Sequence, residues 1–533
     1  MRFLLPALAV ATLVAQTARP AQKVQEAPLR AHLAFLADDL LEGRGTGQRG
    51  AELTVRYLES QLQALGLQPA RGTAYRQAVP LLGLKTLVGQ STLSFLGGSA
   101  CATPQFGAEI VYGPGLAKAE QVFDAPVVFV GFGIDAPEQR WDDYKGVDVR
   151  GKVLLMLVNE PAPTAEEPDL FDGANLSTYG RWTTKFEMAA KHGAAGVLLI
   201  HTTPSASYGW SVVQNGWDSE RFSLAQSPAA TALQGWVTEP TARALVKQGG
   251  QTLEALLARA QHRDFRPMPL DLTLKGTLRA TVRSVDQFNV AGVVPGTDPL
   301  LMDELVIYTA HWDHLGLGQT PAVDSHPGHG PDAIYNGAVD NASGCAALLA
   351  MAQAALLTPA KRSQMFLFVC AEEQGLLGSM AYAQAPLWPL ARTAADLNLD
   401  SLNFIAPTRD IALPFGSRST LGGLGAAVAK ASGLSVAPDR PDTAGGYFRS
   451  DHYSFVRAGV PALSVGGGRD YIGSDLPALK AKAAAYGKRY HQVTDEYDPT
   501  WDLRGMVQQA QFAFDFGQAI ANASTRPSFI PVR

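Results

Sequence analysis

From about residue 285 onward, short apolar runs typical of buried strands alternate with longer segments that have helical periodicity. The strand candidates are 288–294, 305–310, 365–371 and 397–399, and the helix candidates are 343–357, 421–432 and 503–521. This alternation predicts an α/β fold, a three-layer α/β/α sandwich around a mostly parallel central sheet. Ligands of such folds bind beyond the carboxyl ends of the strands.

The charge balance excludes one class of partner. The chain has 533 residues and a formal net charge of −5, with its basic residues dispersed. Proteins that bind nucleic acid or anionic membranes through charge need a basic surface. We therefore expect no nucleic-acid partner, and the sequence leaves the oligomeric state open.

The N-terminus has the pattern of an export signal. Arg2 precedes an apolar stretch at 3–15, which is shorter than the roughly 20 residues that span a bilayer. We expect a signal peptide over residues 1–21, with cleavage after Ala15 or close to Ala21. No later segment is long and apolar enough to be a membrane anchor. A periplasmic or secreted protein, with no integral membrane segment after signal removal, is the expectation.

The character of the sequence changes twice behind the signal. Residues 22–84 are largely helical in pattern, and residues 85–271 are rich in glycine and in strand-like runs such as 125–131 and 151–157. The alternating pattern then occupies 272–533. We predict a catalytic domain built from the first and third segments, with the second inserted into it as a separate β-rich module.

The cysteines do not form a disulfide scaffold, because Cys101, Cys345 and Cys370 are few and odd in number. Cys345 lies at a helix start and Cys370 at the end of an apolar strand. We expect both to be small buried packing residues.

Five side chains that can bind metal ions lie at strand ends or in glycine-rich turns of the alternating region: His311, Asp340, Glu373, Asp400 and His491. Imidazole and carboxylate ligands suit zinc. Five ligands exceed the number that one open tetrahedral site uses. Two ions that share one bridging carboxylate would use all of them, and paired ions are common in hydrolases.

Each motif alone also has a structural explanation. The pair His311 and Asp313 could lie in an ordinary surface loop, although alternation would let Asp313 brace the imidazole. Asp340 could cap the helix that follows it. Glu372 and Glu373 could begin a solvated helix, or one could bind metal while the other accepts a proton from water. Their joint occurrence favours a metal centre.

The combined motifs resemble those of the co-catalytic di-zinc aminopeptidase family, which includes bacterial leucyl aminopeptidases and glutamate carboxypeptidases. The resemblance covers about 285–521 and the helical N-terminal piece. The inserted module resembles a protease-associated domain through GKVLLM and KFEMAAKHGAAGVLLIH. The motifs of the catalytic part are HWD, NGAVDNASG, AEEQGLLGS, NLDSLN, RSDHYSF and a late histidine.

The resemblance implies two zinc ions per chain with divided ligands. One ion would be held by His311 and Asp400, and the other by Glu373 and His491. Asp340 would bridge the two ions.

The resemblance also implies three residues that act without binding metal. Glu372 would be the general base, and Asp313 would orient His311. Tyr447 would contact the tetrahedral intermediate, although the cysteines that flank this position in the family are absent here.

Four further histidines lie outside this ligand set. His314 is one residue off the family pattern, and alternation predicts that it points away from Asp313. His326 and His329 lie in a Gly/Pro-rich loop, where we expect a solvated or substrate-facing role. His452 is expected to pack against the wall of the pocket.

The resulting prediction is an exported zinc-dependent exopeptidase, an aminopeptidase that hydrolyses peptide substrates. A dipeptidase or carboxypeptidase would share the metal centre, and Arg449, Arg457 and Arg469 could supply its carboxylate clamp. A glutaminyl cyclase or a non-enzymatic receptor-like protein would also fit part of the motif pattern. Side-chain preference and the role of the inserted module are open.

Overall fold

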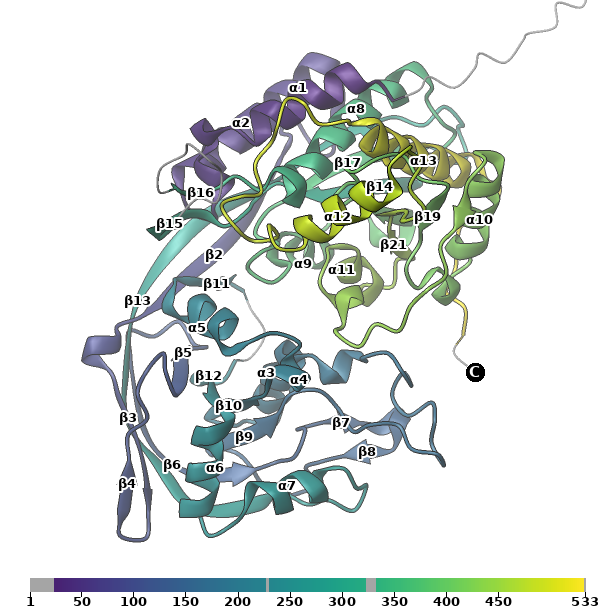
Figure 1. Cartoon of the computed structure of the whole chain (residues 1–533). Coiled ribbons are helices and arrows are strands. Elements are labelled where there is room, and N and C mark those ends of the chain that lie inside the picture. Colours follow the sequence, from purple (N-terminus) through teal and green to yellow (C-terminus); the bar gives the residue numbers. More distant parts are fainter. Residues whose placement is uncertain (1–23, 227–229, 323–331, 532–533) are drawn as a thin grey trace, which may run out of the picture.

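The computed structural model describes residues 24–226, 230–322 and 332–531. The expected signal peptide and the loop with His326 and His329 lie outside these residues. The chain forms two lobes joined by long strands (Figure 1). The upper lobe contains the N-terminal helices and the C-terminal half, and the lower lobe contains the segment between them.

The central sheet of the upper lobe confirms the predicted α/β class. Four adjacent strands are parallel, and β13 lies antiparallel to the last of them and continues into the lower lobe. In spatial order these strands are β21 (Ala462–Ser464), β18 (Thr393–Asn398), β14 (Leu305–His311), β17 (Ser363–Val369) and β13 (Met268–Val294). Short parallel strands with buried residues on both faces explain the near-continuous apolar runs.

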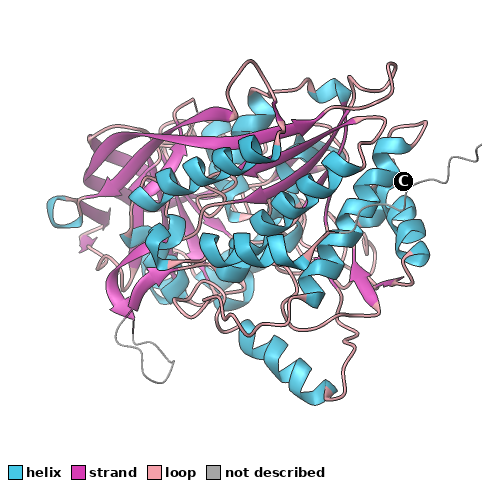
Figure 2. Cartoon of the chain, turned by 90° about the horizontal axis from the view of Figure 1, so that it is seen from above, coloured by secondary structure: helices cyan, strands magenta, loops and turns pink. Residues whose placement is uncertain are grey.

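Helices cover both faces of this sheet (Figure 2). Alternate side chains of β14 enter two different cores: Val306 and Tyr308 pack on one face, and Leu305 and Ile307 on the other. The first face is covered by α1 (Glu26–Leu36), α2 (Arg49–Leu65), α8 (Ser343–Leu357), α10 (Leu421–Ala431) and α13 (Arg504–Asn522). The second is covered by α9 (Leu377–Gln384) and α11 (His452–Arg457).

The lower lobe has a second sheet that continues from the first through β13. Its parallel strands are β6 (Glu120–Phe129), β9 (Val153–Leu157), β10 (Gly196–His201) and β12 (Leu233–Thr238). The antiparallel β5 (Ile110–Pro114) pairs with β12 at one edge, and β13 pairs with β6 at the other and also with β3 (Thr92–Gly97). Its helices are α3 (Trp182–Lys191), α4 (Thr203–Ala206), α5 (Trp210–Asp218), α6 (Glu239–Gln248) and α7 (Leu253–Ala260).

The two lobes share a ribbon of paired strands. β2 (Arg76–Thr86) runs antiparallel to β13 from the register pair Arg76–Val290 to the pair Thr86–Ala280. The domain boundaries expected after residues 84 and 271 fall inside these two strands. The division into a catalytic domain and an inserted module therefore stays a prediction. The strands β2 and β13 belong to both of these units.

The remaining elements are short. They are β1 (Gln68–Pro69), β4 (Ala100–Ala102), β7 (Asp135–Ala136), β8 (Trp141–Asp142), β11 (Arg221–Leu224), β15 (Gly316–Ala322), β16 (Asp332–Tyr335), β19 (Asp410–Ala412), β20 (Ser435–Val436), β22 (Gly466–Gly467) and α12 (Leu476–Tyr486).

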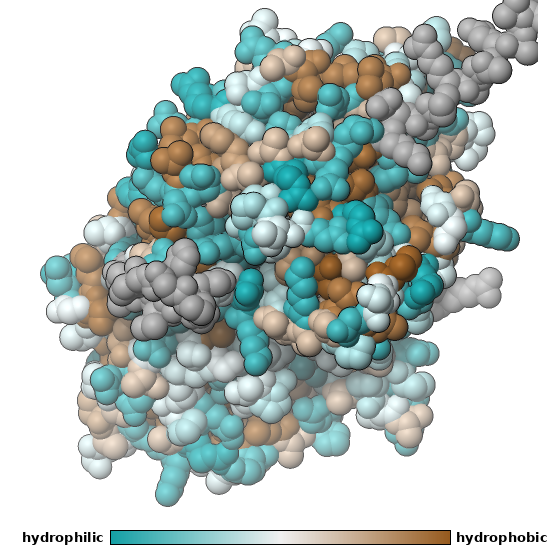
Figure 3. Space-filling view, turned by 45° about the horizontal axis from the view of Figure 1, so that its top comes forward, coloured by the Kyte–Doolittle hydropathy of each residue, from teal (hydrophilic) through white to brown (hydrophobic). Residues whose placement is uncertain are grey.

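Two simpler expectations concern the surface and the cysteines. Hydrophobic and hydrophilic side chains are interspersed over the face drawn in Figure 3. No helix in the described ranges combines the length and the apolar character needed to cross a membrane. Cys345 and Cys370 are buried, as predicted, and Cys101 is exposed.

Candidate metal centre

Three of the predicted ligands and acids lie where neighbouring parallel strands end. His311 is the last residue of β14, Glu372 follows β17 by three residues and Asp400 follows β18 by two. β14 lies between β17 and β18 in the sheet. The carboxyl ends of adjacent parallel strands therefore bring these side chains to one edge of the sheet.

Asp340 is held in the turn before α8 by an acid that the motif analysis did not single out. The carboxylate of Asp495 accepts hydrogen bonds from the amides of Val339 (3.1 Å) and Asp340 (3.1 Å). Asn341 Oδ1 accepts from the Gly344 amide at 2.9 Å, so Asn341 serves the helix end and the Asp340 carboxylate is free for other contacts. The only sign in the sequence that Asp495 belongs to the site was its position four residues after the predicted ligand His491.

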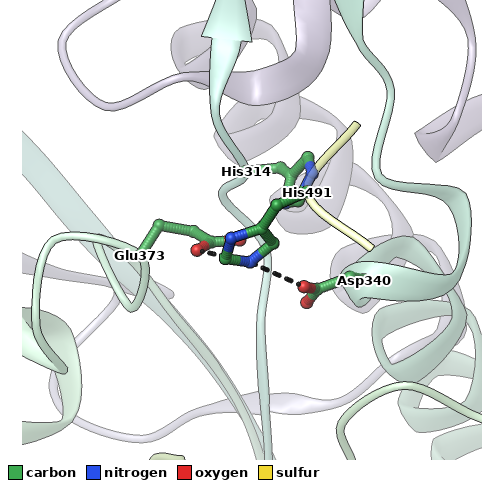
Figure 4. Close-up of side chains that lie close together, drawn as sticks. All are labelled: His314, Asp340, Glu373 and His491. Atoms are coloured by element: carbon green, nitrogen blue, oxygen red, sulfur yellow. Dashed lines mark hydrogen bonds and ion pairs between the residues drawn. The ribbon is translucent and has the colours of Figure 1, made fainter. Parts of the chain in front are cut away.

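The predicted ligands meet in two groups that share Asp340. His311 Nε2 lies 3.1 Å from Asp340 Oδ1 and 3.5 Å from Asp400 Oδ1. His491 Nε2 lies 3.2 Å from Asp340 Oδ2 and 3.1 Å from Glu373 Oε2. The two oxygens of one carboxylate thus face different groups, the second of which is drawn in Figure 4.

These spacings fit a metal ion better than a hydrogen-bond network. Two ligands about 2.0–2.1 Å from a tetrahedral zinc ion lie about 3.4 Å apart, close to the four distances observed. His491 Nε2 is buried and makes no hydrogen bond, although two carboxylates surround it. A buried polar atom without a partner is unfavourable, and a cation between these groups would satisfy it. The residues therefore fit zinc.

His314 joins the second group, which the sequence analysis did not predict. It is buried, and its Nδ1 lies 2.6 Å from Glu373 Oε1. That distance is a short hydrogen bond and not the spacing of two ligands on one ion. His314 therefore holds one oxygen of Glu373 while the other faces His491 (Figure 4).

The placement of His314 outside the metal centre rested on strand alternation, and the structure corrects it. β14 ends at His311 and the following residues turn. The period of two applies only inside a strand. The only sign in the sequence that His314 belongs to the centre was the presence of a second histidine in the HWDH segment.

Asp313 contacts His311 through a different atom from the one expected. The main-chain oxygen of Asp313 lies 3.1 Å from His311 Nδ1, whereas its carboxylate is 3.9 Å away. That carboxylate instead accepts from the amides of Glu372 (3.0 Å) and Glu373 (3.4 Å). Asp313 therefore orients the His311 ring with its backbone and positions both glutamates with its side chain.

The adjacent glutamates have opposite electrostatic environments. Burial raises the pKa of Glu372 well above its ordinary value, and the charge of Glu373 adds to this effect while His311 opposes it. Burial and Asp340 also act to raise the pKa of Glu373, but His491 and His314 lower it to about 2. Glu373 is suited to remain an anionic ligand and Glu372 to exchange a proton.

The polypeptide around the centre is anchored by a buried arginine. Arg44 donates to the main-chain oxygens of Trp312 (2.8 Å), Asn336 (2.5 Å) and Gly337 (2.9 Å), and also to that of Leu36. It therefore ties the end of β14 to the loop before Asp340, and through Leu36 to the N-terminal helix.

Tyr447 lies three residues before Ser450 in a loop that the lower lobe contacts. Its ring stacks under the Arg418 guanidinium, 4.4 Å from the ring centroid, and meets His452 edge-on at 5.0 Å. Arg418 in turn pairs with Asp172 of the lower lobe, with Nη2 and Oδ2 2.6 Å apart. Burial raises the pKa of Tyr447, and Arg418 opposes that shift. Ser450, in the same loop, donates to Asp400 Oδ2 at 2.6 Å.

The lower lobe docks on this loop through three further contacts. The Leu176 amide donates to the main-chain oxygen of Asp442 at 2.8 Å, and the Asp442 amide donates to Asn175 Oδ1 at 2.9 Å. The hydroxyls of Thr178 and Tyr453 lie 2.8 Å apart. We call the contact between residues 172–181 and 207 of the lower lobe and residues 418 and 442–453 of the upper lobe the inter-lobe seam.

Comparisons with known proteins show what this chain is similar to. Residues 289–514 match the model of peptidase family M28. The search of curated proteins returned no match. An aminopeptidase from an Aneurinibacillus strain has 19% identity and a TM-score of 0.52, with 96% of this chain and 97% of that chain covered.

Two other solved structures align over similar lengths. A zinc aminopeptidase from Bacillus subtilis has 16% identity and a TM-score of 0.47, with 94% and 95% coverage. A peptidase M28 precursor from Shewanella amazonensis has 18% identity and a TM-score of 0.44, with 95% and 97% coverage.

Proposed function

We propose that this chain is a di-zinc aminopeptidase. The premise is that it is a metallo-exopeptidase whose residues 289–514 match the model of peptidase family M28. The observation that carries the proposal is the placement of Asp340, whose two oxygens face separate groups of histidine and carboxylate. His311 and Asp400 would hold one zinc ion, and Glu373 and His491 the other. Zinc bound there would supply a Lewis acid for the scissile carbonyl.

The chain's own residues would carry the proton and fix the geometry. Glu372, with its raised pKa, would take a proton from the attacking water and pass it to the leaving amine. Asp313 and His314 would hold the glutamates in register. Tyr447, in the same loop as the Asp400 partner Ser450, would donate its hydroxyl to the oxyanion that develops on the substrate.

The charge of the centre supports the aminopeptidase polarity. Glu372 and Asp451 add carboxyl groups beyond the three that the histidines contact. A free α-amine would be attracted to either of these two groups in its ionised form. The inserted module would cover the cleft and admit chain ends, and export by the N-terminal signal would place the enzyme in the periplasm or outside the cell.

The deciding experiment compares the two ends of a peptide. We expect rapid hydrolysis of aminoacyl-nitroanilides and of peptides with a free N-terminus, and none of their N-acetylated forms. A carboxypeptidase would instead cleave N-acetylated peptides and require a free C-terminal carboxylate. Zinc analysis of the same preparation should give two ions per chain.

A further inference from the structure

Asp442 joins the two lobes through all four of its polar groups. Its main-chain oxygen accepts from the Leu176 amide at 2.8 Å, and its own amide donates to Asn175 Oδ1 at 2.9 Å. Its carboxylate accepts from the amides of Gly446 and Tyr447, each at 2.8 Å. One residue therefore connects the lower lobe to the turn that carries Tyr447.

The lower-lobe side of this contact is itself anchored. Glu160 Oε1 accepts from the Ser177 amide at 2.7 Å, and the other oxygen of Glu160 accepts from the Ser177 hydroxyl. The two lobes also approach closely, because a β-carbon at Gly445 would lie 2.8 Å from Leu176 Cδ2, which is too short for two carbon atoms that are not bonded. The segment before α3 is thus a fixed surface on which residues 442–447 rest.

The same loop is held at two further points. Asp172 of the lower lobe pairs with Arg418 at 2.6 Å, and the Arg418 guanidinium lies 4.4 Å from the centroid of the Tyr447 ring. Three residues after Tyr447, the Ser450 hydroxyl donates to Asp400 Oδ2 at 2.6 Å. The loop is therefore tied to the lower lobe at one end and to a predicted metal ligand at the other.

The loop depends on such contacts for its position. Residues 442–450 contain a single turn of 3-10 helix, Gly446–Phe448, and so short a helix does not fix a side chain by itself. A donor to an oxyanion must lie within about 2.7–3.1 Å of it. A displacement of about 1 Å can reduce a rate about 100-fold.

We propose that the lower lobe positions Tyr447 for the reaction and that Asp442 is the positioning residue through which it does so. The inserted module then contributes to the turnover rate as well as to the covering of the cleft. The inference rests on the proposed function, from which it takes the role of Tyr447.

The test removes the connection and follows kcat. With an aminoacyl-nitroanilide, Asp442→Ala should lower kcat about tenfold to 100-fold, while KM and zinc content stay near the wild-type values. Asp442→Asn keeps one acceptor oxygen for the Tyr447 amide and should recover part of the loss. Asn175→Ala removes only the acceptor in the lower lobe. It should lower kcat by a smaller factor, and it keeps the test decisive if Asp442→Ala fails to fold.

A double variant identifies the path of the effect. Tyr447→Phe alone should lower kcat about 10²- to 10³-fold, as the loss of an oxyanion donor does. If Asp442 acts through the Tyr447 hydroxyl, adding Asp442→Ala to Tyr447→Phe should change kcat by less than about twofold. A residue that only stabilised the fold would reduce kcat by the same factor in both backgrounds.

Asp142→Ala is the matched control, because the Asp142 carboxylate also accepts from two consecutive amides, those of Tyr144 (2.7 Å) and Lys145 (2.9 Å), in a turn of the lower lobe outside the seam. Its kcat should equal that of the wild type. Three results would overturn the inference: a wild-type kcat in Asp442→Ala, an equal loss with and without the Tyr447 hydroxyl, or an equal loss in Asp142→Ala.

Failure of the proposed function has a separate signature. A wild type that cleaves N-acetylated peptides would overturn the aminopeptidase polarity, and the same comparison of variants would then be made with those peptides. A fully active Tyr447→Phe enzyme would refute the proposed role of Tyr447, and the inference would fail with it. An impaired Tyr447→Phe enzyme beside unimpaired Asp442→Ala and Asn175→Ala enzymes would overturn the inference alone.

Discussion

The two lobes contain sheets of similar construction but place different chemistry at the ends of their strands. In the upper lobe, β14, β17 and β18 are followed by His311, Glu372 and Asp400. In the lower lobe, β10 and β12 end in His201 and Thr238, and no residue of this lobe belongs to a group of described side chains that could hold a metal ion.

The lower lobe nevertheless contains a sizeable hollow at this end of its strands. A cavity of about 740 Å³ is lined by His201, Trp210 and Thr238, among others. Burial lowers the pKa of His201, and its Nε2 contacts the main-chain oxygen of Tyr208 at 3.0 Å. This histidine is satisfied by the protein itself. The buried His491 Nε2, which lies between two carboxylates without a hydrogen bond, therefore indicates a reactive site in the upper lobe. The hollow beside His201 does not by itself indicate one in the lower lobe.

The strongest way to test this contrast is to remove the shared carboxylate. Asp340→Ala should lose both zinc ions or hold one poorly, and kcat should fall by more than about 10⁴-fold, beyond the loss of a general base alone. His201→Ala should leave zinc and kcat intact and cost about 1–3 kcal/mol of stability. Zinc analysis, kinetics and denaturant unfolding measure these outcomes. An Asp340→Ala enzyme that remained active would refute the bridged centre.

A second test separates the adjacent glutamates, whose environments push their pKa values apart. Glu372→Gln should keep zinc and substrate binding and lose kcat by about 10²- to 10⁴-fold. Glu373→Gln should instead lower zinc affinity, with activity partly recovered at high zinc concentration. Parallel measurements of bound zinc and kcat decide the assignment. Exchanged phenotypes would reverse the two roles.

The sequence predicted most of the upper lobe because its patterns are local. The helix over 343–357 has the predicted bounds, and the helix ending before Gly66 stops where that glycine adopts a left-handed φ of 85°. The class of the sheet follows from alternating runs. The sequence could not predict that Asp313 turns its backbone toward His311, because that depends on where β14 ends.

Contacts between segments that are distant in the chain were the other feature that the sequence could not predict. The bond from Asp495 to the Asp340 turn joins residues 155 positions apart, and no local pattern reports such a pair. The ion pair between Asp172 and Arg418 likewise joins two lobes. The sequence analysis noted His314 but could not predict its contact with Glu373, because the direction of the His314 side chain depends on the turn after β14.

A third prediction tests His314 against a similar pair in the other lobe. His314→Ala should weaken zinc binding about tenfold to 100-fold, because it removes the group that orients Glu373. At saturating zinc, kcat should recover to near the wild-type value. His192→Ala, which removes a histidine 3.2 Å from Asp135 in the lower lobe, is the control and should leave zinc affinity unchanged. A chelator competition titration measures both. Unaltered affinity in His314→Ala would show that Glu373 does not need its partner.

The last prediction, which leaves the reaction itself aside, is a dependence of stability on pH that separates the lobes. His452 is buried against Tyr447, and burial lowers its pKa to about 4 from 6.5 in the unfolded chain. Because the unfolded state binds the proton first, the stabilisation is complete above pH 6.5 and is lost as the pH falls toward 4. The linked free energy is roughly 3 kcal/mol.

His452→Gln should therefore flatten the decrease in unfolding free energy between pH 6.5 and 4, whatever its effect at pH 8. His262→Gln, at an exposed position of the lower lobe, should reproduce the wild-type slope. Denaturant unfolding of the three proteins at several pH values, with zinc held in excess, measures the difference. If His452→Gln and the wild type lose stability in parallel, the acid sensitivity of the upper lobe arises elsewhere and His452 already titrates normally in the folded protein.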